Sequence, residues 1–232
     1  AGVFAVVPGD GPTTGRTLSE HPDLDLVHFT GSFEVGHQIA NFAARSFKPV
    51  ATELGGDNAF VVLEDADLDQ AASCAVWSAL WYQGQTCITA GRHIVHRDVA
   101  DAFTEAVVER VRKLRVGDPL REDVDLGPII SETQLRRFAD GLVRPSVEAG
   151  ARVAVGGTHD GLFYQPTVLT GVTTDMPVFQ EEIFGPVMPI TVVDDEAEAL
   201  ALVNRHRTLM NSVFTGDPMR GLAFAEGVKS NE

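Results

Sequence analysis

The sequence of 232 residues has few cysteines, few basic residues and no long apolar run. Its 2 cysteines, Cys74 and Cys87, rule out a disulfide framework and indicate a reducing compartment, so we expect a cytoplasmic protein. The sequence has 18 lysines and arginines and 33 acidic residues. The resulting net charge of −15 argues against nucleic acid or an anionic membrane as a partner. No stretch approaches the roughly 18 apolar residues of a membrane span. The 7 histidines show no metal-ligand spacing with the cysteines, so we predict no metal site.

The composition is that of a globular protein, with 44% hydrophobic and 22% charged residues, and the length fits one large or two modest domains. Short β-branched runs alternate with amphipathic stretches of helical period, which predicts parallel α/β layers. The expected strands are Val3–Val7, the first, and residues 24–29, 48–52, 59–63, 92–96, 153–155, 167–169, 186–193 and 212–215. The expected helices cover 33–46, 68–80 after an Asp67 cap, 99–114, 132–149, 196–204 and a last one from 218.

One cysteine stands out by its setting. Cys87 follows the end of an apolar helix and Gly84, in a loop of small and amide side chains where a substrate can reach a thiol. A free cysteine alone is most often a small buried hydrophobe. Upstream, however, Glu53 leads into a Gly55-Gly56 turn, and a nucleophile paired with a carboxylate is an arrangement for acyl transfer.

These stretches together resemble the aldehyde dehydrogenase family. The resemblance rests on five motifs in family order: Phe29–Ser32, Glu53–Gly56, Leu63–Asp69, Gly84–Cys87 and Glu181–Val187. It implies an α/β fold with a partial Rossmann-type dinucleotide-binding domain at residues 1–56 and a parallel α/β catalytic domain at 57–232. The family chain is about twice as long, so the resemblance implies an internal fragment that lacks an upstream oxyanion-hole Asn and ribose-binding Lys, and a downstream closing loop and strand-exchange arm.

The resemblance also assigns roles to residues. Cys87 is the expected nucleophile, with its own backbone N–H as one oxyanion donor, and Glu53 is the expected general base, which we predict to be buried. Glu182 is expected to bind the nicotinamide ribose and Phe184 to pack beside that ring, although Glu182 next to Glu181 is also typical of a solvated acidic pair. Trp81 is expected to line the aldehyde tunnel. From the residues alone, Trp81 and Trp77, one helical turn apart, are predicted to be core residues.

The implied cofactor is NAD or NADP. By resemblance Gly31 and Ser32 face its phosphates, and the other cofactor residues, several of them near the adenine, are Gly11, Pro12, Val35, Gly36 and Leu54. A helix N-terminus suits a pyrophosphate, although Ser32 is also a common helix cap. The run Gly9–Gly15 does not meet the dinucleotide fingerprint G-x-G-x-x-G and by itself is typical of a surface loop.

Three functions remain open from the sequence. The first is NAD(P)-dependent oxidation of an aldehyde to a carboxylic acid. The local sequence around Trp81–Tyr82 and Gly91–His96 is similar to that of benzaldehyde-type members of the family. The second is an acylating relative that passes the thioester to phosphate or coenzyme A, for which Glu53 is dispensable. The third is a non-catalytic fragment that serves as a binding or structural module. The resemblance implies a homodimer or homotetramer for the full-length form, and little activity for the 232-residue chain by itself.

Overall fold

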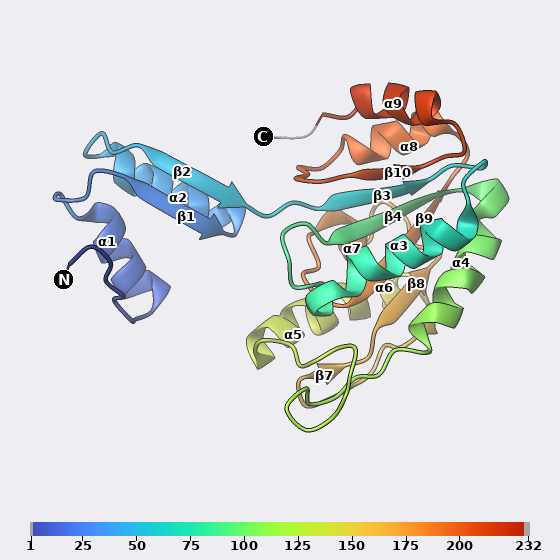
Figure 1. Cartoon of the computed structure of the whole chain (residues 1–232), viewed down its shortest axis with the longest axis horizontal. Helices are drawn as coiled ribbons and strands as arrows, with labels where there is room; N and C mark the ends of the chain where they lie inside the picture. Colours follow the sequence, from blue (N-terminus) through green and yellow to red (C-terminus); the bar gives the residue numbers. More distant parts are fainter. Residues whose placement is uncertain (1, 230–232) are drawn as a thin grey trace. The chain divides into compact units, whose positions relative to one another are not determined.

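The computed structural model of the chain describes residues 2–229. The chain divides into two compact units, Ala1–Gly55 and Gly56–Glu232, each of which we describe by itself (Figure 1). Within the described residues, no helix combines the length and apolarity that a bilayer crossing requires.

The first unit is built on two parallel strands, β1 (Val27–Gly31) and β2 (Val50–Leu54), joined by helix α2 (Phe33–Ala44). Ser32 caps α2, since its hydroxyl accepts a hydrogen bond from the Val35 N–H at 3.4 Å. The predicted helix and both predicted strands are therefore present, with the strands starting two to three residues later than expected. Helix α1 (Arg16–Glu20) precedes them.

Two predictions for the first unit are wrong. Val3–Val7 forms no strand, and its apolar side chains are exposed, with Phe4 at 86%. A strand needs a neighbour for its backbone hydrogen bonds, and the only strand pair described in this unit is β1 with β2. The glycine-rich run is not a loop either. Asp10 accepts a hydrogen bond from the Thr13 N–H at 2.7 Å and starts a wide helical turn, η1 (Gly11–Gly15), that continues into α1.

The second unit contains a six-stranded sheet in the order β10-β3-β4-β9-β8-β5. Its pairings are parallel except that β5 runs antiparallel to β8, so the predicted parallel α/β fold is confirmed, with one antiparallel strand at the edge of the sheet. A short hairpin of β6 and β7 lies outside it and was not predicted. The strands are β3 (Asn58–Val62), β4 (Ala90–His96), β5 (Arg152–Val155), β6 (His159–Asp160), β7 (Phe163–Tyr164), β8 (Thr167–Thr170), β9 (Val187–Val193) and β10 (Ser212–Phe214).

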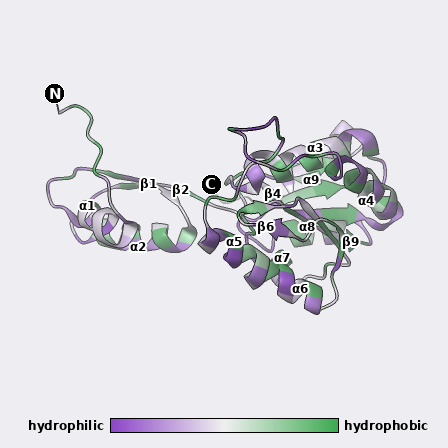
Figure 2. Cartoon of the chain, turned by 90° about the horizontal axis from the view of Figure 1, so that it is seen from below, coloured by the Kyte–Doolittle hydropathy of each residue, from purple (hydrophilic) through white to green (hydrophobic). Residues whose placement is uncertain are grey.

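Helices cover both faces of this sheet (Figure 1). On β3, Phe60 and Val62 pack with α3 and α4, whereas Ala59 and Val61 belong to the core formed with α5, α8 and α9. This alternation is the period of two expected of a strand buried on both sides, and Figure 2 shows the strands of the sheet as largely hydrophobic. The helices are α3 (Leu68–Leu80), η2 (Trp81–Gly84), α4 (Arg97–Val111), α5 (Glu132–Phe138), η3 (Ala139–Val143), α6 (Arg144–Glu148), α7 (Pro177–Gln180), α8 (Glu196–Val203) and α9 (Pro218–Glu226).

The predicted helix at 132–149 is present as three consecutive segments, α5, η3 and α6. The wide turn η3 directly precedes α6, whose second residue is Pro145. Proline has no backbone N–H and its ring crowds the carbonyl four residues earlier, so the helix widens at this point instead of continuing regularly.

Candidate active site

Four loops of the second unit meet at one edge of the sheet. Parallel strands β10, β3, β4 and β9 are consecutive neighbours, and the loops that precede them therefore lie side by side. These loops contain residues 208–211, 56–57, 85–89 and 181–186. One small hollow is lined from three of them, by Gly56, Thr86, Glu182 and Phe184 among others. The motifs that are far apart in the sequence are thus brought together at the amino ends of the strands, not at the carboxyl ends where open α/β sheets usually bind ligands.

The loop that carries Cys87 is shaped by left-handed backbone. Helix α3 ends at Leu80, and in the following turn Tyr82 and Gln83 have φ angles of 54° and 57°, which non-glycine residues rarely adopt. Gly84 also has a positive φ, and a Cβ on it would lie 2.3 Å from the Gly185 carbonyl oxygen. Only glycine allows this approach, so Gly84 joins the cysteine loop to the Glu181–Val187 loop. Cys87 itself is exposed, and Cys74 is half-buried in α3.

Helix α5 holds the Glu182–Phe184 segment through two side chains that the sequence analysis did not identify. Gln134 Nε2 donates to the Phe184 carbonyl at 2.9 Å. Arg137 donates to the carbonyls of Ile183 at 3.1 Å and of Glu182 at 2.9 Å. Both side chains belong to an ordinary amphipathic helix pattern, and their partners lie 45 to 50 positions along the chain, so no local signal pointed to them.

Glu182 and Glu181 have different surroundings. Glu181 is exposed, whereas Glu182 is half-buried and accepts a hydrogen bond from the Gly56 backbone. Burial raises the pKa of Glu182, against the opposing effects of Arg137 and of the Gly56 N–H. Glu182 is therefore not a solvated member of an acidic pair, and its carboxylate is fixed to the turn that follows Glu53–Gly55.

The prediction that Trp77 and Trp81 are core residues is wrong. Their side chains are 63% and 50% exposed, and the two rings stack on each other with centroids 5.5 Å apart. Both line a cavity of about 250 Å³, and so do Thr86 and Ile88, the neighbours of Cys87. Trp81 thus lies beside a largely apolar cavity next to the thiol loop, and its contact with substrate stays a prediction.

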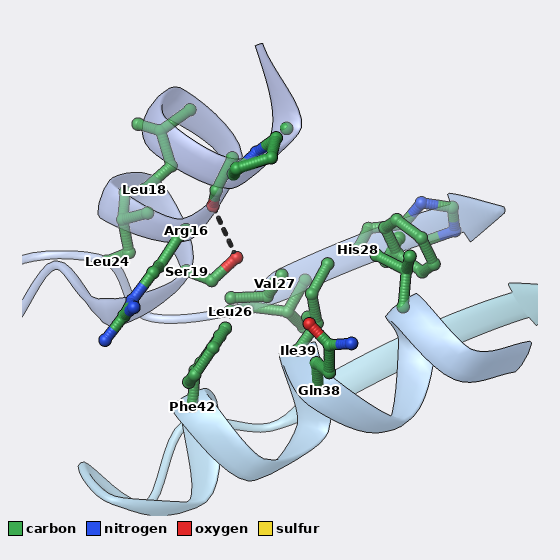
Figure 3. A pocket seen from close by; sticks show the side chains of 15 residues that line it. Arg16, Leu18, Ser19, Leu24, Leu26, Val27, His28, Gln38, Ile39 and Phe42 are labelled. Atoms are coloured by element: carbon green, nitrogen blue, oxygen red, sulfur yellow. Dashed lines mark hydrogen bonds between the residues drawn. The ribbon is translucent and has the colours of Figure 1, made fainter. Parts of the chain in front are cut away.

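The first unit has a larger cavity of about 700 Å³ between α1, β1 and α2 (Figure 3). Three predicted cofactor residues, Gly11, Pro12 and Val35, line it. In Figure 3 the side chains of Arg16 and Phe42 lie at one side of this cavity, and the Arg16 guanidinium is 5.2 Å from the centre of the Phe42 ring. A cavity with apolar walls and a flat aromatic and guanidinium surface fits a planar base such as adenine.

The remaining predicted residues of the first unit do not line this cavity. Gly31 ends β1, and Ser32 caps α2. A Cβ on Gly36 would lie 2.5 Å from Leu54 Cδ2, so these two residues pack α2 closely against β2. Glu53 is in β2 and is exposed, so the expectation that it is buried is wrong for this chain. Its side chain emerges from the strand next to the half-buried Leu54.

Fold and site together define an α/β protein with an exposed thiol loop and a separate cavity that fits a nucleotide base. The sequence profile of the aldehyde dehydrogenase family matches residues 1–231, so the chain belongs to the aldehyde dehydrogenase family.

Individual relatives agree with this assignment. The chain is 47% identical over 203 residues to "Benzaldehyde dehydrogenase [NAD(+)]" of Pseudomonas putida. The matched region covers 88% of this chain and 41% of that protein. It is 43% identical over 230 residues to "Vanillin dehydrogenase" of an Amycolatopsis species, covering 98% of this chain and 47% of that protein. A crystal structure described as an E. coli NADP dependent enzyme superposes with a TM-score of 0.95 at 36% identity, over 100% of this chain and 49% of that one. The chain thus spans less than half the length of these relatives.

Proposed function

We propose that this chain supplies the catalytic cysteine and much of the cofactor site of an NAD(P)-dependent enzyme that oxidises an aromatic aldehyde to the carboxylic acid. The observation that carries the proposal is the contact between the Cys87 loop and the Glu182–Phe184 loop, made at Gly84 and Gly185. It brings an exposed thiol and a half-buried carboxylate suited to ribose hydroxyls to one edge of the sheet. The names of the benzaldehyde and vanillin dehydrogenases support the aromatic substrate class.

The residues present fit the cofactor in two places. The cavity lined by Gly11, Pro12 and Val35 would hold the adenine, and Glu182 would accept hydrogen bonds from the nicotinamide ribose. The unused hydrogen-bonding capacity of a carboxylate suits vicinal hydroxyl donors. When bound, the nicotinamide would supply the acceptor for the hydride that leaves the substrate carbon. The relatives include an NAD-dependent and an NADP-dependent protein by name, and we propose NAD or NADP here.

Cys87 begins the reaction. Its thiolate attacks the aldehyde carbon, so a carbon–sulfur bond forms and the carbonyl oxygen becomes an alkoxide, which the Cys87 N–H helps to stabilise. When the hydride leaves with its electron pair, the carbon–oxygen double bond is restored and a thioester remains on Cys87. The cavity beside Trp81 holds the aromatic ring during these steps, because a flat apolar surface of this kind favours another ring.

Glu53 completes the cycle. It removes a proton from a water molecule that attacks the thioester carbon, the carbon–sulfur bond breaks, and the acid and the Cys87 thiolate are released. Glu53 is exposed in the chain as described, which leaves its carboxylate open to water. A hydrolytic base is useful when water is the acyl acceptor, and this favours a carboxylic acid as the product.

The proposal is tested in the full-length protein, meaning this chain with the flanking sequence that its relatives have. We expect Cys87→Ala to abolish production of reduced cofactor from benzaldehyde while the variant still binds NAD in a fluorescence titration. Cys74→Ala is the control for the second thiol: Cys74 lies in α3 and lines the cavity beside Trp81, so this variant can change the KM for benzaldehyde but should retain turnover. Aldehyde oxidation that survives in the Cys87 variant, or is lost equally in both variants, would refute the assignment.

A further inference from the structure

Asn58, a residue without a role so far, makes four hydrogen bonds with its side chain. The residue is 1% exposed, at the first position of β3. Its amide nitrogen donates to the carbonyl of Cys87 at 2.8 Å and to that of Thr89 at 3.0 Å. Its amide oxygen accepts from the N–H groups of Leu209 at 2.8 Å and Met210 at 3.0 Å. Two donors and two lone pairs are the full capacity of an asparagine amide, so the side chain is saturated.

The need for this side chain follows from the sheet. The register between β3 and β4 shifts at this point, because Asn58 pairs with Ala90 and Ala59 pairs with Arg92. The cysteine loop leaves the ladder immediately before that pairing. Asn58 supplies hydrogen-bond donors there to the carbonyl of Cys87 and to that of the buried Thr89.

We propose that Asn58 is a positioning residue for Cys87. By holding the carbonyl of the nucleophile itself, it fixes the backbone from which the thiol and the oxyanion-binding N–H project. The Asn58 amide oxygen binds the N–H groups of residues 209 and 210. The side chain therefore connects the backbone of the nucleophile to the loop before β10 as well as to β3. The proposal rests on the proposed function for its kinetic consequence, and on the hydrogen bonds alone for its conformational consequence.

Asn58→Asp isolates the part of the network that faces the cysteine. Aspartate has the same shape and keeps an acceptor for Leu209 and Met210, but it replaces the two donors by an oxygen that repels the carbonyls of Cys87 and Thr89. Asn211→Asp is the matched control. Asn211 belongs to the same junction, where it accepts from the Ala59 N–H at 2.9 Å and donates to the Thr208 hydroxyl at 2.8 Å, with no bond to the cysteine loop.

The kinetic test uses the full-length protein with benzaldehyde and NAD. A small displacement of a reacting group can cost on the order of a hundredfold in rate, so we expect Asn58→Asp to lower kcat by at least about tenfold. The KM for NAD and for benzaldehyde should stay within a few-fold of the wild type, because neither binding surface includes Asn58. Asn211→Asp should keep kcat close to the wild-type value. A folded Asn58→Asp protein with wild-type kcat, or equal losses in both variants, would overturn the proposal.

A second measurement does not depend on catalysis. Amide hydrogen exchange on the 232-residue chain should become faster in the peptide containing Cys87–Thr89 for Asn58→Asp and not for Asn211→Asp. Unchanged exchange in that peptide contradicts the positioning role even if the kinetics change. If the wild-type full-length protein oxidises no aldehyde, the proposed function fails and the exchange result decides the positioning role by itself. If Asn58→Asp does not fold, Asn58→Ser, which retains one donor, is measured by the same two criteria.

Discussion

Asp57 Oδ2 lies 3.0 Å from Arg92 Nε in the interior of the second unit, with the two side chains 6% and 0% exposed. Arg92 also donates to the Leu202 carbonyl at 2.7 Å, which ties the end of α8 to the turn that binds Glu182. The carboxylate fits there because the adjacent strand residue is Gly91, where a Cβ would lie 2.7 Å from Asp57 Oδ1. The Asp57–Arg92 pair is therefore part of the buried structure that supports the four loops before β10, β3, β4 and β9.

The first prediction concerns the pH dependence of this pair. Burial raises the pKa of Asp57 from 3.8 to about 7, against the opposing effect of Arg92. The folded protein then binds more protons at Asp57 than the unfolded chain does between these values, so this group's contribution to stability decreases as the pH rises toward 7 and is constant above it. Asn at position 57 has no such dependence. The free energy of unfolding of the wild type, relative to that of Asp57→Asn, should therefore decrease as the pH rises toward 7, by at most about 1.4 kcal/mol per pH unit.

Urea unfolding of the 232-residue chain and its Asp57→Asn variant at pH values from about 5.5 to 8.5 measures this difference. Nearby His206 should not contribute, because burial lowers its pKa to about 4, below the range. The other histidines are common to both proteins, so their contributions to the difference cancel. A difference in unfolding free energy that stays constant across this range would show instead that Arg92 keeps Asp57 ionised in the folded state.

The second prediction concerns the two thiols. Cys87 is exposed in its loop and Cys74 is half-buried in α3, so iodoacetamide should label Cys87 first in the folded 232-residue chain. Peptide mapping after a brief treatment with iodoacetamide gives the ratio of labelled Cys87 to labelled Cys74. Labelling in urea is the control, because there the two thiols should react at similar rates. Preferential labelling of Cys74 in the folded chain would contradict the accessible position of Cys87.

The third prediction concerns the aromatic cavity. Trp81→Ala in the full-length protein should raise the KM for benzaldehyde by about tenfold, which corresponds to the upper range for an aromatic pair. The KM for acetaldehyde, which has no ring to stack, should change little. Stability should change little as well, since the Trp81 side chain is 50% exposed. Equal increases for both aldehydes would show that Trp81 shapes the site without contacting the ring.

Local patterns explain which parts of the fold were predictable from the sequence. The cap at Asp67 and the alanine face of α3 both depend on neighbours within one or two turns, and both are present. Val3–Val7 has the composition of a strand, but a strand exists only with a partner, and composition does not reveal one. Trp77 has an apolar side chain at helical spacing, yet it is 63% exposed and stacks on Trp81 beside a cavity.

The site was predictable only where a motif marked it. Cys87 and Glu182 were identified from motifs, and the structure brings their loops together. Asn58 was missed because its partners are 29 to 152 positions away and depend on a register shift that leaves no trace in the sequence. Gln134 and Arg137 were missed for the same reason. The burial expected of Glu53 was wrong, because the resemblance concerned its role and carried no information about its exposure.

The central claim is that Cys87 carries the acyl group and Glu53 releases it. It is tested most directly by trapping the intermediate in the full-length Glu53→Gln variant. The variant is mixed with benzaldehyde and NAD, stopped in acid and digested, and the peptides are weighed by mass spectrometry. We predict one benzoyl group on the peptide containing Cys87, formed only when both aldehyde and NAD are present, together with a burst of about one equivalent of reduced cofactor per site, as covalent catalysis requires. Turnover at the wild-type rate without an accumulated adduct, or an adduct on Cys74, would contradict the account.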